Sequence, residues 1–245
     1  MMKLWEQLAD WKKNCRWVEL SREVSTETVH WAGFPTMEEK KLFDVVEHGF
    51  NVNLYSIVSQ YGTHVDAPWH FVAEGRTLET FGINDMVMPL CVIDASAKCA
   101  ENADYALSVE DVLAWEAKHG RIPEGAFVAF RSDWYKKGGM AAMQNADAEG
   151  KCHYPGWDVK TIKFLVEERN VASIGHEASD TDPAAVGPVE GYPGELYILQ
   201  QERFQIELMI NLDQVPEAGA VIFCTFPRVK GSAGFTARCF ALCEK

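Results

Sequence analysis

The sequence lacks long apolar runs and is poor in basic residues. No run of apolar residues approaches the roughly 20 that a membrane span needs, and the N-terminal segment carries charges every few positions. We therefore expect neither a membrane span nor a signal peptide. The 23 Lys and Arg residues face 36 Asp and Glu residues, for a formal net charge of −13. Because an acidic surface repels phosphate groups, nucleic acid and anionic membranes are not expected as partners.

Paired cysteines and flexible linkers are also missing. The seven cysteines are an odd number and none forms a CxxC pair, so neither a disulfide framework nor a zinc ribbon is expected. This usage is typical of reduced thiols and predicts a cytoplasmic protein. The chain has no linker rich in Pro, Gly or Ser and no internal repeat. We therefore interpret residues 1–245 as a single domain.

What the sequence does contain is a pattern of strands that alternate with helices in the middle of the chain, with further strands toward both ends. An acidic loop is expected at residues 177–190. This pattern predicts a mixed α/β fold rather than a purely doubly wound sheet. Helices are expected at residues 1–14, 108–118 (with Ser108 as N-cap and Asp111 at the third helical position), 158–169 and 195–201, and strands at 50–58, 86–93, 126–131, 171–174, 205–212, 220–226 and 235–242.

One short window, residues 59–71, concentrates the residues that carry chemistry. His64 and Asp66 are two positions apart, so on an extended backbone both side chains project from the same face. Such a nitrogen and oxygen pair can share a divalent cation, and the mixed set suits zinc, manganese or iron better than calcium. His70 follows Pro68, which turns the chain and lets His70 return toward the same site. An isolated histidine is often an ordinary surface or core residue, so spacing alone leaves both interpretations open.

The string GTHVDAPWH at residues 62–70 resembles the HxGTHxDxPxH signature of the cyclase-like metal-dependent hydrolases, a family that includes bacterial kynurenine formamidase and isatin hydrolase. The resemblance implies a swivelling β/β/α fold with a mixed sheet and flanking helices. It also implies a divalent metal, hydrolysis of an amide or cyclic imide C–N bond in a small aromatic or cyclic substrate, and a homodimer or homotetramer. Weaker similarities extend it from about Val18 to Leu242, at residues 19–21, 131–134, 211–213, 230–231 and 238.

The sequence departs from this family at two positions. Gln60 stands where the motif has its first His, and Glu195, twelve residues before Glu207, stands where the binuclear formamidases have a His. Because both replacements remove an imidazole, we expect one Mn²⁺ or Zn²⁺ per chain, held by His64 and Asp66. Gln60 is either a third ligand through its amide oxygen or a hydrogen-bond partner. Glu195 and Glu207 remain candidates for positions at or near this site.

Further candidates lie outside the motif. His176 follows a buried strand and either contacts the metal or substrate or is a polar strand end. Asp182 is a candidate for orienting one of the site's histidines. Aromatic side chains in or beside loops can clamp a planar substrate by stacking, although core packing explains them equally well. These aromatic residues are Trp31, Phe34, Trp69 and Phe71.

Two functions are compatible with these residues. In the first, the chain is an enzyme whose metal acidifies a water molecule for attack on a small-molecule carbonyl. His70 is then the general acid/base that passes the proton to the leaving nitrogen. In the alternative, the chain is a non-catalytic, metal-stabilised binding or structural protein of the same family, as the replacements at Gln60 and Glu195 suggest.

Overall fold

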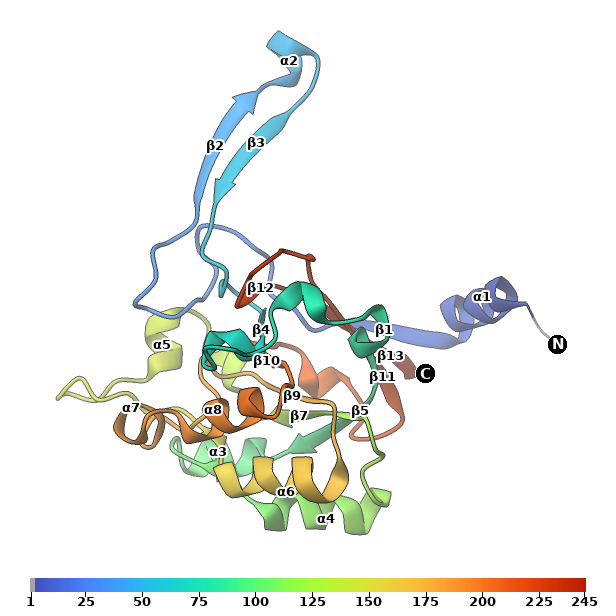
Figure 1. The fold of residues 1–245 in the computed structure, drawn as a ribbon, viewed down its shortest axis with the longest axis vertical. Coiled ribbons are helices and arrows are strands. Elements are labelled where there is room, and N and C mark those ends of the chain that lie inside the picture. The colour runs from blue at the N-terminus through green and yellow to red at the C-terminus, as the bar shows by residue number, and fades with distance from the viewer. Residues whose placement is uncertain (1–2) are drawn as a thin grey trace.

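The computed structural model describes residues 3–245, and its body is built on a single mixed sheet (Figure 1). The strands of this sheet are β1 (Cys15–Glu19), β4 (His64–Asp66), β5 (Val87–Asp94), β7 (Phe127–Arg131), β9 (Ser173–His176), β10 (Gln205–Glu207), β11 (Ala220–Thr225), β12 (Gly234–Thr236) and β13 (Arg238–Glu244). The order of these nine strands is β1-β13-β11-β5-β7-β9-β10-β4-β12. The central strands β5, β7, β9 and β10 are parallel, and the flanking pairs are antiparallel. The predicted mixed α/β fold is confirmed.

The sheet curls strongly on itself. Only Ala237 separates β12 from β13, yet Thr236 pairs with His64 on β4 while Arg238 pairs with Thr225 on β11. Strands from the two halves of the strand order therefore lie close together, and they enclose an apolar core that contains Val65. The prediction of one strand over residues 235–242 is wrong because the chain changes strand partners at Ala237.

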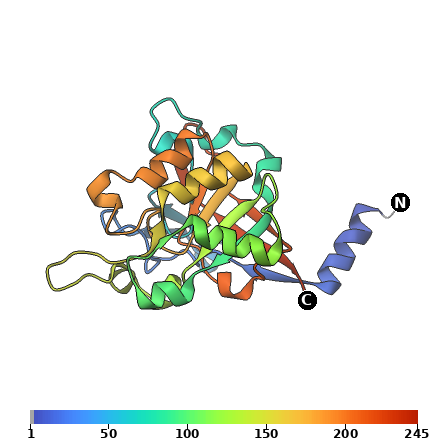
Figure 2. The ribbon, with the colours of Figure 1, turned by 90° about the horizontal axis from the view of Figure 1, so that it is seen from below.

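Helices cover the outer face of the curled sheet (Figures 1 and 2). These helices are α4 (Val109–His119), α6 (Val159–Arg169), α8 (Pro193–Gln200) and the short α3 (Ser96–Glu101), whose buried side chains share one core with the sheet. Two further short helices are α5 (Met140–Gln144) and α7 (Gly187–Glu190). Strand β7 is buried on both faces, with Phe127 in the inner core and Val128 in the core beneath the helices, which explains its uninterrupted apolar sequence. Ser108 is the N-cap of α4 and Asp111 its third residue, as predicted, and the two side chains form a capping box.

Two elements project from the body. Strands β2 (Glu38–Phe43) and β3 (Val52–Ser56) form a separate antiparallel hairpin tipped by α2 (Val45–His48), which we call the arm (residues 38–56). The expected strand at 50–58 corresponds to β3, but β2 was not predicted because its sequence, EEKKLF, shows no alternation. Helix α1 (Leu4–Asn14) also stands away from the body and has no buried residue. The predicted helix at residues 1–14 is thus confirmed from residue 4 onward, and residues 1 and 2 lie outside the described part of the chain.

The remaining differences from prediction are local. The expected strand at 205–212 ends at Glu207, because Leu208 and Asn211 adopt left-handed backbone angles, with φ of 55° and 59°, that turn the chain. A short parallel pair, β6 (Ala106–Leu107) and β8 (Gly156–Trp157), lies beside the main sheet. Among residues 3–245, no helix is long and apolar enough to cross a bilayer.

Candidate metal centre

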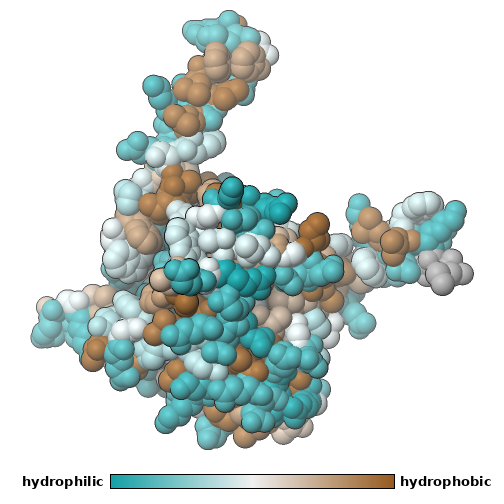
Figure 3. Space-filling view, viewed as in Figure 1, coloured by the Kyte–Doolittle hydropathy of each residue, from teal (hydrophilic) through white to brown (hydrophobic). Residues whose placement is uncertain are grey.

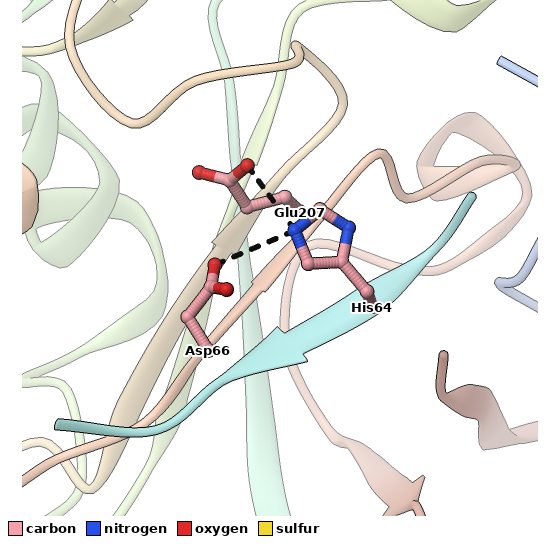
Figure 4. A group of neighbouring side chains, drawn as sticks. All are labelled: His64, Asp66 and Glu207. Atoms are coloured by element: carbon pink, nitrogen blue, oxygen red, sulfur yellow. Dashed lines mark ion pairs between the residues drawn. The ribbon is translucent and has the colours of Figure 1, made fainter. Parts of the chain in front are cut away.

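Two neighbouring strands bring together one imidazole and two carboxylates. His64 and Asp66 lie on β4, and Glu207 lies directly opposite His64 on the antiparallel strand β10. The three side chains point toward one another (Figure 4). His64 Nε2 is 3.5 Å from Asp66 Oδ2 and 3.6 Å from Glu207 Oε2, and one donor atom of each residue lies within 4.8 Å of the others. The sequence spacing predicted that His64 and Asp66 project from one face, and on the extended backbone of β4 they do.

The local backbone fixes which nitrogen of His64 faces the carboxylates. His64 Nδ1 is 2.8 Å from the carbonyl oxygen of Gly62, which can only accept a hydrogen bond. Nδ1 therefore carries a hydrogen, and Nε2 faces the space between Asp66 and Glu207. Gly62 is needed at this turn because its φ is 64° and a Cβ atom there would lie 2.8 Å from the methyl group of Thr28.

The charges of this cluster fit a divalent cation. Burial lowers the pKa of His64, but the neighbouring Asp66 and Glu207 carboxylates outweigh burial and raise that pKa to about 9. Burial, together with the nearby Asp66 charge, raises the pKa of Glu207 well above its usual value. Among the described residues, no hydrogen-bond donor satisfies the buried Asp66 Oδ1. The raised pKa of His64 keeps a proton on its Nε2 between the two carboxylates, and a bound cation would replace that proton. The imidazole nitrogen and the buried acidic oxygens then form the N/O donor set that zinc and manganese accept.

His70 faces the same cluster from a 3₁₀ turn over Pro68–His70. Its Nε2 lies 3.8 Å from Asp66 Oδ1 and 3.9 Å from Glu195 Oε1, which projects from α8. Gln60 Nε2 lies 3.5 Å from His70 Nδ1, so the amide of Gln60 is directed at the His70 ring. A Cβ atom at Gly234 on β12 would lie 2.7 Å from the same amide nitrogen, so only glycine lets β12 pass this closely. The structure thus brings Gln60, His70 and Glu195 to the site.

His176 lies beside the cluster but does not line the cavity at this site. Its ring is buried, and Nε2 is 3.3 Å from Glu207 Oε1. Burial lowers the pKa of His176 to about 4, so the ring is neutral near pH 7. His176 therefore contacts Glu207 rather than the space where a substrate enters.

The cluster lies at one wall of a cavity of about 290 Å³. Three of the four aromatic residues singled out in the sequence, Trp31, Phe34 and Phe71, line this cavity, and Trp31 meets Phe34 edge-on at 5.0 Å between ring centroids. Trp69 does not line it, and its side chain is turned toward solvent. Aromatic walls beside polar groups suit a small planar ligand. The other lining residues are Gln60, His64, His70, Ser179, Asp180, Tyr192, Glu195 and Glu207.

The acidic segment after β9, expected as a loop at residues 177–190, carries buried rather than solvated acidic side chains. Glu177, Asp180 and Asp182 are all buried. Glu177 accepts hydrogen bonds from the backbone and side chain of Ser132, and burial raises its pKa to about 8. Asp182 accepts from the backbone N–H groups of Gly194 and Glu195 at 2.8 and 3.1 Å. Asp182 thus anchors the first turn of α8, which carries Glu195, rather than orienting a histidine.

Sequence reasoning missed several residues of the site. Asp180 was seen only as part of an acidic loop, and Ser179 and Tyr192 carried no motif. Tyr192 closes the cavity opposite Phe71, with 6.1 Å between ring centroids. Gln205 was also missed, although its position two residues before Glu207 on a strand places both side chains on one face. That spacing is the signal by which Gln205 was detectable.

A curled mixed α/β sheet with a buried His, Asp and Glu cluster on an aromatic cavity defines a metal-dependent enzyme for small molecules. The model of the Cyclase family matches residues 18–183. The chain therefore belongs to the Cyclase family.

Sequence relatives agree with this assignment. The chain is 30% identical over 220 residues to an isatin hydrolase of Roseibium aggregatum, a match that covers 86% of the chain and 82% of the relative. It is 29% identical over 119 residues to a kynurenine formamidase of Bacillus cereus, which covers 46% of the chain and 56% of the relative.

Solved structures show the same fold over the whole chain. Isatin hydrolase A from Labrenzia aggregata, bound to benzyl benzoate, superimposes with a TM-score of 0.92 at 29% identity, covering 99% of this chain and 100% of that one. Isatin hydrolase A from Ralstonia solanacearum gives a TM-score of 0.90 at 31% identity, covering 100% and 98%. Family and relatives together place the chain among the metal-dependent hydrolases that act on carbon–nitrogen bonds outside peptides.

Proposed function

We propose that the chain hydrolyses the C–N bond of a small cyclic amide with aromatic character, of the kind that isatin represents. The single observation that carries this proposal is the buried His64, Asp66 and Glu207 cluster, of which His64 and Glu207 line an aromatic cavity. We propose Mn²⁺ or Zn²⁺ as the cation, one per chain, because one cluster supplies one nitrogen and two carboxylate donors.

In this proposal, different residues of the chain bind the cation, transfer the proton and orient the substrate. A divalent cation at such a site supplies Lewis acidity, which polarises a carbonyl group and acidifies water. His64, Asp66 and Glu207 hold the cation, and their burial keeps bulk water from competing for it. His70 is half-buried at the cavity wall and moves the proton to the leaving nitrogen from Nε2. Trp31, Phe34 and Phe71 orient the planar substrate.

The choice of a cyclic amide over a formamide is supported by the extent of the similarities. The isatin hydrolases match nearly the full chain, whereas the kynurenine formamidases match less than half of it. The site also has Glu195 where a second imidazole is expected in the binuclear formamidases. A cavity of about 290 Å³ is at the lower end of ligand-site sizes, which suits a bicyclic molecule without a long side chain.

A substrate panel tests this proposal directly. Isatin-like lactams, cyclic imides, lactones and N-formyl anilines are assayed with metal-stripped protein and with added Mn²⁺ or Zn²⁺. We expect the highest kcat/KM for the isatin-like compounds, activity only after metal addition, and about one bound ion per chain by elemental analysis. Hydrolysis by metal-free protein would contradict the metal assignment. Inactivity across the panel with the ion bound would instead support the non-catalytic alternative.

We also propose that the chain assembles with copies of itself as a homodimer or homotetramer. The arm exposes apolar side chains that the body does not cover (Figure 3). Val52 and Leu54 lie on one face of β3, Asn53 and Tyr55 lie on the other, and the side chains of Val52, Leu54 and Tyr55 are exposed. Helix α1 exposes Trp5 in the same way. A two-stranded hairpin alone is marginally stable in water, and self-association is the commonest way to cover such faces.

Charging the arm is expected to break this assembly. We expect the wild-type chain to migrate at twice its 27.5 kDa mass or more in light scattering after size exclusion. The double variant Val46→Glu with Leu54→Glu should shift it to a monomer, because both side chains are exposed and neither change disturbs a core. Val189→Glu, at an exposed residue on α7, is the matched control and should leave the mass unchanged. A monomeric wild-type chain at micromolar concentration would refute the proposed assembly.

A cytoplasmic location is proposed as well. All seven cysteines are free, and Cys224 lies opposite Cys239 on neighbouring strands without a disulfide. Free thiols in such numbers suit a reducing compartment.

A further inference from the structure

We propose that Gln205 is a positioning residue whose side-chain amide holds Asp66, Glu195 and Glu207 in the arrangement that receives the cation. This inference rests on the cation site of the proposed function and assigns a role to a residue outside the His, Asp and Glu set. Gln205 is fully buried on β10, and its backbone lies opposite Asp66 on β4.

The amide nitrogen of Gln205 stands between three carboxylates. Nε2 is 3.3 Å from Asp66 Oδ2, 3.2 Å from Glu195 Oε1 and 3.2 Å from Glu207 Oε1. These acceptors come from three different elements, β4, α8 and β10, so a single side chain links three acidic elements of the site. The link crosses 139 positions of sequence between Gln205 and Asp66.

The neighbouring carboxylates fix the orientation of this amide. Thr181 Oγ1 lies 2.7 Å from Gln205 Oε1 and 3.2 Å from Glu207 Oε1, so its one hydrogen serves either acceptor. The reverse orientation would turn the amide oxygen toward three carboxylate oxygens and remove the donor that Asp66 Oδ2 and Glu195 Oε1 share. Because carboxylates only accept hydrogen bonds when ionised, the nitrogen must face them.

The chemistry of an amide explains why this residue type stands here. Repulsion and burial drive neighbouring carboxylates apart or toward protonation. A lysine or arginine would relieve that repulsion but would place a positive charge where the cation binds. A neutral amide donates hydrogen bonds but adds no positive charge that would repel the cation. It has two hydrogens for three acceptors, so the acidic oxygens keep free lone pairs for the cation.

The test measures cation binding and not only turnover. Gln205→Met keeps the length and buried volume of the side chain and removes both donors, and Thr181→Val removes the hydroxyl that contacts both the Gln205 amide oxygen and Glu207 Oε1. Gln200→Ala, at an exposed glutamine of α8, is the control. Each full-length chain is stripped with a chelator and titrated calorimetrically with Mn²⁺ and, separately, Zn²⁺, and its folding is checked by circular dichroism.

We expect Gln205→Met to bind Mn²⁺ about 10–100-fold more weakly than the wild-type chain, with kcat falling and KM little changed. Thr181→Val should show a smaller loss in the same direction, and Gln200→Ala no loss. Cation affinity at the wild-type level in folded Gln205→Met would overturn the proposal. If Gln205→Met does not fold, unchanged affinity in Thr181→Val overturns it instead. A wild-type chain that binds neither ion would contradict the proposed function itself, so the two failures are distinct.

Discussion

Replacing His64 by alanine is expected to remove both the bound cation and hydrolysis. His64 provides the only nitrogen of the described His, Asp and Glu cluster, and its Nε2 is already directed between Asp66 and Glu207 by the bond from Nδ1 to Gly62. Without it, two carboxylates remain, and the site loses the mixed N/O character that favours manganese and zinc. We expect a loss of affinity beyond the roughly 10–100-fold that follows removal of a residue that only supports a ligand.

Calorimetric titration with Mn²⁺ and a turnover assay check this outcome together. His153→Ala is the matched control, because His153 lies between Asp104 and Asp147 on the surface, at 2.7 and 3.3 Å, and also pairs with two carboxylates. The control should bind the ion and turn over at wild-type rates. A His64→Ala chain that keeps one ion and full activity would show that the cation lies elsewhere.

The part of this site that the sequence predicted is the part encoded locally. His64 and Asp66 are neighbours on one short strand, so their common face follows from strand periodicity alone. His70 follows four residues after Asp66, past a proline that turns the chain, and it returns to within 3.8 Å of Asp66 Oδ1. Local backbone rules thus place three of the polar side chains of the motif.

The part that the sequence did not predict depends on contacts between distant segments. Gln205 reaches Asp66 only because β10 pairs with β4 in the curled sheet, and no local pattern reveals that pairing. The acidic residues after β9 have the composition of a solvated loop, but the first turn of α8 offers backbone donors that bury Asp182. The same limit applies to β2, whose charged sequence becomes a strand only by pairing with β3.

Replacing His70 by alanine is expected to keep the cation and lower kcat by about 10²–10⁴-fold, the usual contribution of a general acid/base. Ser59 donates to Gln60 Oε1, so the Gln60 nitrogen faces His70 Nδ1 and makes it an acceptor. The ring hydrogen therefore lies on Nε2, directed toward the cavity and the acidic oxygens. Nε2 is therefore the atom that passes a proton to the departing amide nitrogen, and the ring regains a proton from the attacking water, so that it is neutral before and after the step.

Parallel measurements of kcat and Mn²⁺ affinity separate this role from that of a ligand. His70 Nε2 is 3.8 Å from Asp66 Oδ1 and 3.9 Å from Glu195 Oε1, so alanine leaves the His64, Asp66 and Glu207 donors in place. We expect kcat to fall while the affinity for Mn²⁺ stays within a few-fold of the wild-type value. Parallel losses of affinity and kcat would instead make His70 a ligand.

Replacing Gln60 by alanine is expected to lower kcat less than replacing His70. It removes the amide that sets which nitrogen of His70 carries the hydrogen, but it leaves the imidazole itself in place. The ring then rotates and exchanges tautomers more freely, so only a fraction of molecules present the hydrogen at Nε2. The expected loss in kcat is therefore smaller than for His70→Ala. A larger loss, accompanied by weaker Mn²⁺ binding, would identify Gln60 as a ligand through its amide oxygen, because a residue that only orients His70 has no direct effect on the ion.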